Sequence, residues 1–162
     1  MLNRDPQKTV STRIPGDLDE GREETGGTME KQMIILVAYD GSNAARDALE
    51  LGLKHAEAFK GKVVLIRSLT GGSGKDSDDI QRAEDDLAYA ERRCRERSLP
   101  CETHLLIRGL KPGEDIVRYA EECGADEIVM GVRRRSKVGK MLFGSNARYV
   151  IMEAACPVVT IK

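Results

Sequence analysis

Short apolar runs that alternate with amphipathic segments place the strongest constraint on the fold of this chain. Five runs have the length and composition of buried strands, and they occupy residues 33–39, 62–69, 101–108, 126–131 and 157–162. Between them, apolar residues recur at helical spacing, and these segments run from Ser42 to about residue 59, over 80–94, from Pro112 to near Gly124, and from Gly144 or Ser145 to 154. The alternation predicts an α/β fold with one doubly wound, five-stranded parallel sheet and helices on both faces.

The first 32 residues differ from the rest in composition. Residues 1–32 are polar and charged and hold few large apolar side chains. Such a segment cannot bury enough surface to offset the entropy lost on ordering. We therefore expect a disordered leader followed by a single domain over residues 33–162. Because Met29 lies just before the first apolar run, one hypothesis is that the native protein starts there and lacks residues 1–28.

Charge and aromatic content argue against several classes of function. A net charge of −1 gives no reason to expect a polyanionic partner. A chain without tryptophan offers little for stacking the bases of single-stranded nucleic acid. No apolar run approaches the roughly 20 residues that span a bilayer, and the N-terminus carries no secretory signal. We expect a cytoplasmic protein with no membrane segment.

The cysteine and histidine residues follow neither the pattern of a metal site nor that of a disulfide framework. The four cysteines form no C-x-x-C pair, and no histidines cluster near them. Cys94, Cys123 and Cys156 lie at apolar positions, which predicts buried thiols. We interpret His55 and His104 as partly exposed surface residues, since neither lies at a strand end. No Ser-His-Asp or Cys-His arrangement suggests itself.

Two polar segments follow strands at their carboxyl ends, where ligands of doubly wound sheets bind. One begins at Asp40, and the other is residues 131–149, GVRRRSKVGKMLFGSNARY, which holds six Lys or Arg and no acidic residue. Within it, Gly144-Ser145-Asn146 leads into a helix whose first N–H groups suit a phosphate. These observations leave open a phosphate-binding loop, a nucleic-acid patch or a solvated turn.

Three motifs together resemble the universal stress protein family. They are VAYDGS at the first strand, GLKPGEDIVRYAEECGADEIVMG, and GSNARYVIMEAACPVVTIK. They occur in the family's order, and the resemblance spans residues 33–162. It implies a flavodoxin-like, or adenine nucleotide alpha hydrolase-like, fold with strand order 3-2-1-4-5. It also implies a homodimer formed through the last strand, residues 157–162, whose edge would offer unpaired backbone groups to a second copy.

One branch of that family binds ATP through a glycine, two residues, a second glycine, nine residues and then Gly-Ser or Gly-Thr. In this sequence Gly131 and Gly144-Ser145 match, whereas Arg134 replaces the second glycine. The resemblance further implies that Asp40 contacts adenosine. The full set of implied nucleotide-binding residues is Ala38, Tyr39, Asp40, Ser68, Gly131, Val132, Arg133, Arg134, Gly139, Gly144, Ser145 and Asn146.

Two positions in this set depart from the family pattern. One is Ser68, which corresponds to the base pocket together with Ala38 and is more polar than the valine usual at that position. The other is Arg134, because an arginine resists the positive φ that a glycine adopts. Its guanidinium can, however, bind phosphate. Gly139 supplies flexibility in the same loop. The expected ligand is ATP or another adenine nucleotide, with Mg²⁺ as a candidate companion of its phosphates.

The resulting hypothesis is a homodimeric stress-response protein that binds an adenine nucleotide and signals or scaffolds through partner contacts. The alternative is a dimer that has lost nucleotide binding and acts only through protein partners. Nucleic-acid binding through the basic loop is a weaker alternative, because one short loop on a near-neutral domain makes few phosphate contacts. We expect no enzyme activity beyond slow ATP hydrolysis, since the sequence shows neither a dedicated general base nor a Walker-type metal ligand.

Overall fold

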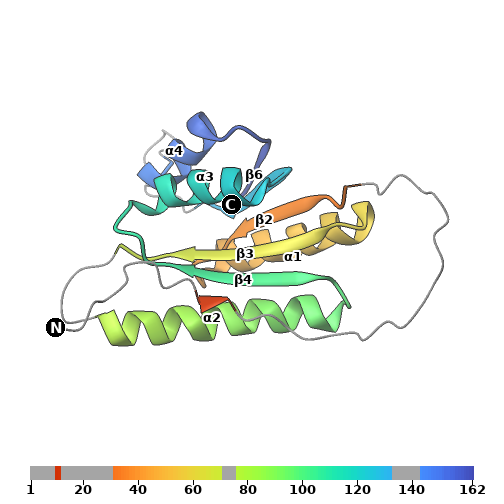
Figure 1. Cartoon of the computed structure of the whole chain (residues 1–162), viewed down its shortest axis with the longest axis horizontal. Helices are drawn as coiled ribbons and strands as arrows, with labels where there is room; N and C mark the ends of the chain where they lie inside the picture. The colour runs from red at the N-terminus through yellow and green to blue at the C-terminus, as the bar shows by residue number, and fades with distance from the viewer. Residues whose placement is uncertain (1–9, 12–30, 71–75, 133–142) are drawn as a thin grey trace.

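Five parallel strands form the centre of the fold. The computed structural model describes residues 10–11, 31–70, 76–132 and 143–162. The strands are β2 (Ile34–Ala38), β3 (Lys62–Ser68), β4 (Cys101–Leu106), β5 (Glu127–Gly131) and β6 (Val158–Ile161). They pair in parallel in the order β4-β3-β2-β5-β6 (Figure 1). Counted along the chain this order is 3-2-1-4-5, so the predicted doubly wound sheet is confirmed.

Two helices cover each face of this sheet. The helices are α1 (Asn43–Phe59), α2 (Asp76–Glu96), α3 (Pro112–Cys123) and α4 (Ser145–Glu153). The first two pack against one face and the last two against the other, which gives two separate hydrophobic clusters. Within the described segments, no helix is both long and apolar enough to cross a membrane.

The helix boundaries follow from residues near their ends. The Ser42 side chain caps α1 by accepting a hydrogen bond from the Ala45 N–H at 3.2 Å. Pro112 opens α3, where its missing N–H costs nothing. Gly124 ends α3 with a φ of 65°, which suits a residue without a Cβ.

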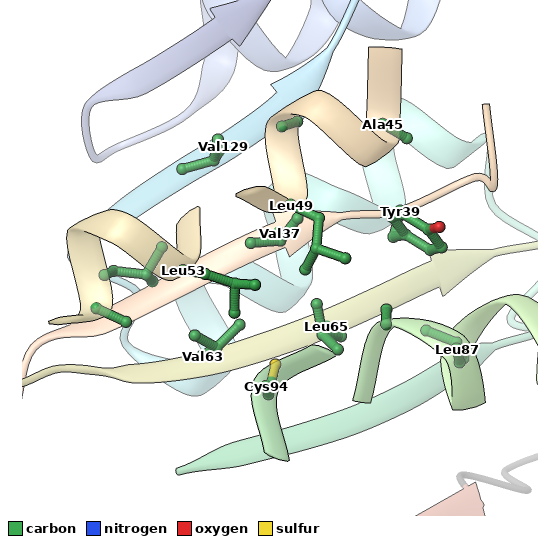
Figure 2. Packing of buried hydrophobic residues seen from close by; sticks show 14 of the residues in the cluster. Val37, Tyr39, Ala45, Leu49, Leu53, Val63, Leu65, Leu87, Cys94 and Val129 are labelled. Carbon is green, nitrogen blue, oxygen red and sulfur yellow. The ribbon is translucent and has the colours of Figure 1, made fainter. Parts of the chain in front are cut away.

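The core is built by alternation along the central strands. Successive side chains of a strand point to opposite faces, so Val37 packs toward α1 and α2, whereas Leu36 packs toward α3 and α4. Figure 2 shows the first of these clusters, in which Leu49 and Leu53 of α1 meet Val37. Strands buried on both faces explain why the sequence reads as continuous apolar runs.

Two features of the fold differ from the sequence-based expectation. Val10–Ser11 forms a short strand, β1, which pairs antiparallel with β4 and makes the sheet six-stranded. The expectation of a disordered leader stays a prediction, because the remainder of residues 1–30 lies outside the described residues. The helical spacing of the apolar residues in this segment predicts Ile151 on the buried face of α4 with Ala147 and Val150, but Ile151 is 40% exposed.

The buried polar groups also differ in part from expectation. His104 is buried rather than partly exposed, and its ring packs on that of Tyr119 with centroids 5.1 Å apart. Burial lowers the pKa of His104 below its usual 6.5. Cys94 is buried, as predicted, whereas Cys123 and Cys156 are only half-buried.

Candidate functional site

A cavity of about 250 Å³ lies at the carboxyl edge of the sheet. Its walls come from the segments that follow β2 and β5, the end of β3, and the first turns of α3 and α4. β2 and β5 are neighbours in the sheet, yet the chain winds away from them in opposite directions. Such a switch point is where doubly wound sheets open a crevice for a ligand.

The cavity gathers most of the residues predicted as a binding site. Nine of the twelve line it: Ala38, Tyr39, Asp40, Ser68, Gly131, Val132, Gly144, Ser145 and Asn146. The other three, Arg133, Arg134 and Gly139, lie outside the described residues. The turn after the first long strand and the start of α4, which are more than a hundred residues apart in the chain, therefore meet at one cavity.

The turn after β2 is held by its own hydrogen bonds. Asp40 Oδ1 accepts a hydrogen bond from the Ser42 N–H at 3.0 Å. Gly41 adopts a φ of 75°, and a Cβ there would lie 2.6 Å from Asp86 Oδ1. The positive φ is what favours glycine here, because the Asp86 carboxylate is the end of a flexible side chain that can shift. The turn fixes the position of Asp40 at the rim of the cavity.

Gly131 is required for close packing between β5 and α1. A Cβ on Gly131 would lie 2.5 Å from both Ala44 O and Ala45 N, in the first turn of α1. These are backbone atoms that cannot rotate away. The glycine thus lets the end of β5 approach α1 closely, and it also lines the cavity.

Tyr39 contributes to the cavity differently from its neighbour Ala38. The Tyr39 side chain belongs to the cluster beneath α1 and α2, as Figure 2 shows. Ala38 points to the opposite face, where it packs with the cluster under α3 and α4. Since α3 and α4 form walls of the cavity, we infer that Tyr39 borders it through its backbone. Burial of the Tyr39 ring raises the pKa of its phenol.

The start of α4 supplies polar groups on one side of the cavity. Gly144 is the N-cap residue and offers no side chain to the first N–H groups of the helix. Those N–H groups, with the positive end of the helix dipole, suit an anion. The Asn146 side chain reaches across to the start of α3, where its Oδ1 accepts a hydrogen bond from the Gly113 N–H at 3.4 Å.

Most of the remaining residues that line the cavity are apolar. Ile66, Ile116 and Met130 line it together with Ala38. Ser68 places a hydroxyl among them and donates a hydrogen bond to Asp115 Oδ2 at 2.7 Å. A slot with apolar walls and few polar groups is typical of a site for a flat organic ring.

Sequence reasoning missed two charged residues at this site. Arg67 lines the cavity and is ion-paired with Asp86 of α2. Asp115 is fully buried behind Ser68. A signal was present in each case: Arg67 interrupts an apolar strand next to Ser68, and Asp115 lies four residues before the inward-facing Tyr119.

Metal-ligating side chains do not cluster in the described segments of the chain. No group of three or more His, Cys, Asp or Glu side chains in those segments could hold a metal ion. Asp40 is the single carboxylate among the described residues that line the cavity.

Comparison with known proteins identifies the family. The sequence profile described as the universal stress protein family matches residues 33–162. The chain belongs to the universal stress protein family. A universal stress protein of Thermus aquaticus is 31% identical over 137 residues, which cover 79% of this chain and 97% of the relative.

Solved structures of other family members have the same fold. A universal stress protein from Archaeoglobus fulgidus superposes with a TM-score of 0.72 at 36% identity, covering 83% of this chain and all of the other. A second structure from Archaeoglobus fulgidus, of the universal stress protein in complex with dAMP, has a TM-score of 0.67 and 32% identity over the same shares of the two chains.

Proposed function

We propose that this universal stress protein binds ATP or a related adenine nucleotide in the cavity between β2 and β5. The observation that carries the proposal is the cavity itself, which joins an apolar slot, a carboxylate rim and an open helix N-terminus at the switch point of the sheet. Binding of dAMP by a relative that is 32% identical supports the choice of an adenine nucleotide.

The two sides of the cavity suggest how a nucleotide would lie. The base would occupy the apolar slot near Ile66 and Ser68, and the phosphates would meet the N–H groups at the start of α4. Asp40, which also lines the cavity, would accept hydrogen bonds from the ribose hydroxyls. The basic residues of 133–140 would add charge near the phosphates, although their positions lie outside the described residues.

We propose that any ATP hydrolysis is slow. The carboxylate that lines the cavity, Asp40, already accepts a hydrogen bond from the Ser42 N–H through one oxygen. A carboxylate engaged in this way is a weak candidate for activating water, because phosphoryl transfer depends on well-placed charge and an oriented nucleophile. Nucleotide occupancy, rather than turnover, would then be the signal that partner proteins read.

Calorimetric titration with ATP tests the proposal. Ala38→Leu adds a larger side chain to the floor of the slot and should weaken ATP binding by at least about tenfold. Ala88→Leu makes the same change on the exposed face of α2 and should leave the affinity unchanged. Absence of binding to the wild-type chain at millimolar ATP would contradict the proposal and leave the alternative of a nucleotide-free scaffold.

We also propose that two copies pair through the edge of β6. Within the described segments β6 is the last strand of the sheet. Pro157 O and Ile161 O accept hydrogen bonds from β5, so the alternate residue Thr160 turns its N–H and C=O groups toward the open edge. Nearby, Met152 is 72% exposed, an unusual place for a large apolar side chain unless a partner covers it.

Sedimentation equilibrium tests this pairing. Thr160→Pro removes an outward N–H group but leaves the ladder to β5 intact, which is the position where an edge strand tolerates proline. The wild-type chain should be a dimer and the variant a monomer with an unchanged circular dichroism spectrum. A monomeric wild-type chain at about 100 μM would exclude the dimer.

A further inference from the structure

A buried pair of polar side chains lies in the wall of the cavity, at the apolar end of the site. Ser68, the last residue of β3, donates a hydrogen bond from its hydroxyl to Asp115 Oδ2 at 2.7 Å. Asp115 is in the first turn of α3 and is completely inaccessible to solvent. Ser68 itself lines the cavity. The serine hydroxyl therefore lies between a buried carboxylate and the space that a ligand would occupy.

The neighbours of Asp115 keep it a hydrogen-bond acceptor. The Arg108 Nε lies 3.7 Å from Asp115 Oδ1, on the side of the carboxylate away from Ser68. A guanidinium is always charged and only donates, so Arg108 forms an ion pair with Oδ1, although the distance is too long for a hydrogen bond. Because Oδ2 accepts the hydrogen bond from Ser68, the proton of the Ser68 hydroxyl is directed at Asp115.

A hydroxyl has one proton and two lone pairs. Because the proton of Ser68 is directed at Asp115, only lone pairs remain for a ligand. The other side chains that β3 and α3 present to this side of the cavity, those of Ile66, Pro112 and Ile116, are apolar. Arg67, although it also lines the cavity, is ion-paired with Asp86 on the α2 side of the sheet. The slot thus offers a ring one acceptor and no donor from these side chains.

We propose that Ser68 selects a purine with a 6-amino group over one with a 6-oxo group, and that Asp115 is the positioning residue that sets this preference. An exocyclic amino group can donate to Ser68 Oγ. A carbonyl in its place would set lone pairs against lone pairs and leave both buried acceptors unsatisfied. The inference rests on the proposed nucleotide site and adds the group that recognises the base.

Paired titrations of the full chain with ATP and inosine triphosphate test the selectivity. The two ligands share the ribose and phosphates and differ in the base, where the 6-amino group of adenine is replaced by a carbonyl and N1 carries a proton. Calorimetry of the wild-type chain should give a Kd for ATP about tenfold or more below that for inosine triphosphate.

Asp115→Asn is the most informative variant because it should change the direction of the Ser68 hydroxyl. Arg108 can only donate, so it will hold the carbonyl oxygen of the new amide and turn the NH₂ group toward Ser68. Ser68 then accepts from the amide, and its own proton is free to point into the cavity. The ratio of the two Kd values should fall by about tenfold, toward equal binding of ATP and inosine triphosphate.

Two further variants guard against a simple loss of folding. Asp79→Asn removes the same charge from the exposed face of α2 and should keep the wild-type ratio. If Asp115→Asn fails to give a cooperative thermal transition, Ser68→Ala provides the same readout: it should weaken ATP binding without weakening binding of inosine triphosphate. Ser68→Thr keeps the hydroxyl and should restore the preference for ATP.

The outcomes separate this inference from the proposed function. No binding of either nucleotide to the wild-type chain would remove the site and this inference together. Equal binding of both nucleotides to the wild-type chain would overturn the inference alone. The inference would also be overturned if the preference for ATP survived unchanged in Asp115→Asn, or in Ser68→Ala where that variant is used. The preference would then come from another group.

Discussion

Gly131→Ala tests whether close contact between β5 and α1 shapes the cavity. The added Cβ would lie 2.5 Å from Ala44 O and Ala45 N, and these atoms would have to move apart by about 0.5 Å to reach even a tight 3.0 Å contact. Overpacking of a well-packed site costs about 1–3 kcal/mol. We expect Gly131→Ala to lower the free energy of unfolding by about 3 kcal/mol. The opposing atoms belong to the backbone of a helix and cannot rotate away as a flexible side chain would.

Thermal unfolding in the absence of nucleotide measures this cost. At about 3 °C per kcal/mol for a chain of this size, the Tm of Gly131→Ala should fall by about 9 °C. Gly144→Ala is the matched control, since its φ is −60° and a Cβ there would meet nothing within 4 Å. Its Tm should change by no more than about 3 °C. A Gly131→Ala variant that melts at the same temperature as the wild-type chain would refute the packing explanation.

Three other predictions follow from single residues. Ser42→Ala removes the cap of α1 and should lower the free energy of unfolding by about 1 kcal/mol in urea denaturation; a loss below about 0.3 kcal/mol would mean that the cap carries little weight. Burial lowers the pKa of His104 in the folded chain, so just below pH 6.5 the unfolded chain binds more protons. This contribution to stability is therefore complete above pH 6.5 and is lost as the pH falls from 6.5 through the lower pKa of the folded chain. His104→Leu should flatten the stability profile between about pH 7.5 and 5.5, and an unchanged slope would contradict the assignment. Asp40→Ala should weaken binding of both ATP and adenosine, whereas a variant that weakens only ATP would place Asp40 at the phosphates.

Local features of the sequence predicted the fold because each depends on a few neighbouring residues. Pro112 and Gly124 set the ends of α3 by their own backbone chemistry, and the capping of α1 depends on a residue three positions away. Continuous apolar runs predicted strands buried on both faces. The carboxyl ends of parallel strands share one edge of the sheet, so the meeting of Asp40 with the segment around Ser145 followed from strand order alone.

Features that depend on distant residues were harder to predict. The burial of His104 depends on its packing with Tyr119 of α3, and the role of Gly131 depends on the position of α1. Asp115 looks like an ordinary acidic residue in the first turn of a helix until Ser68 and Arg108 are placed around it. In each case the deciding partner comes from another element of the sheet or its helices, and no local pattern records it.

Amide chemical-shift mapping of the ¹⁵N-labelled chain during titration with ATP tests most directly whether the cavity at the switch point holds the nucleotide. Saturable shifts should be largest at Ala38, Ser68, Gly131 and Asn146, which come from four separate segments of the cavity wall. Amides of β4 on the far edge of the sheet should hardly move. Shifts centred on β4 or on the outer face of α2, with Ala38 and Gly131 unchanged, would contradict the assignment of the site.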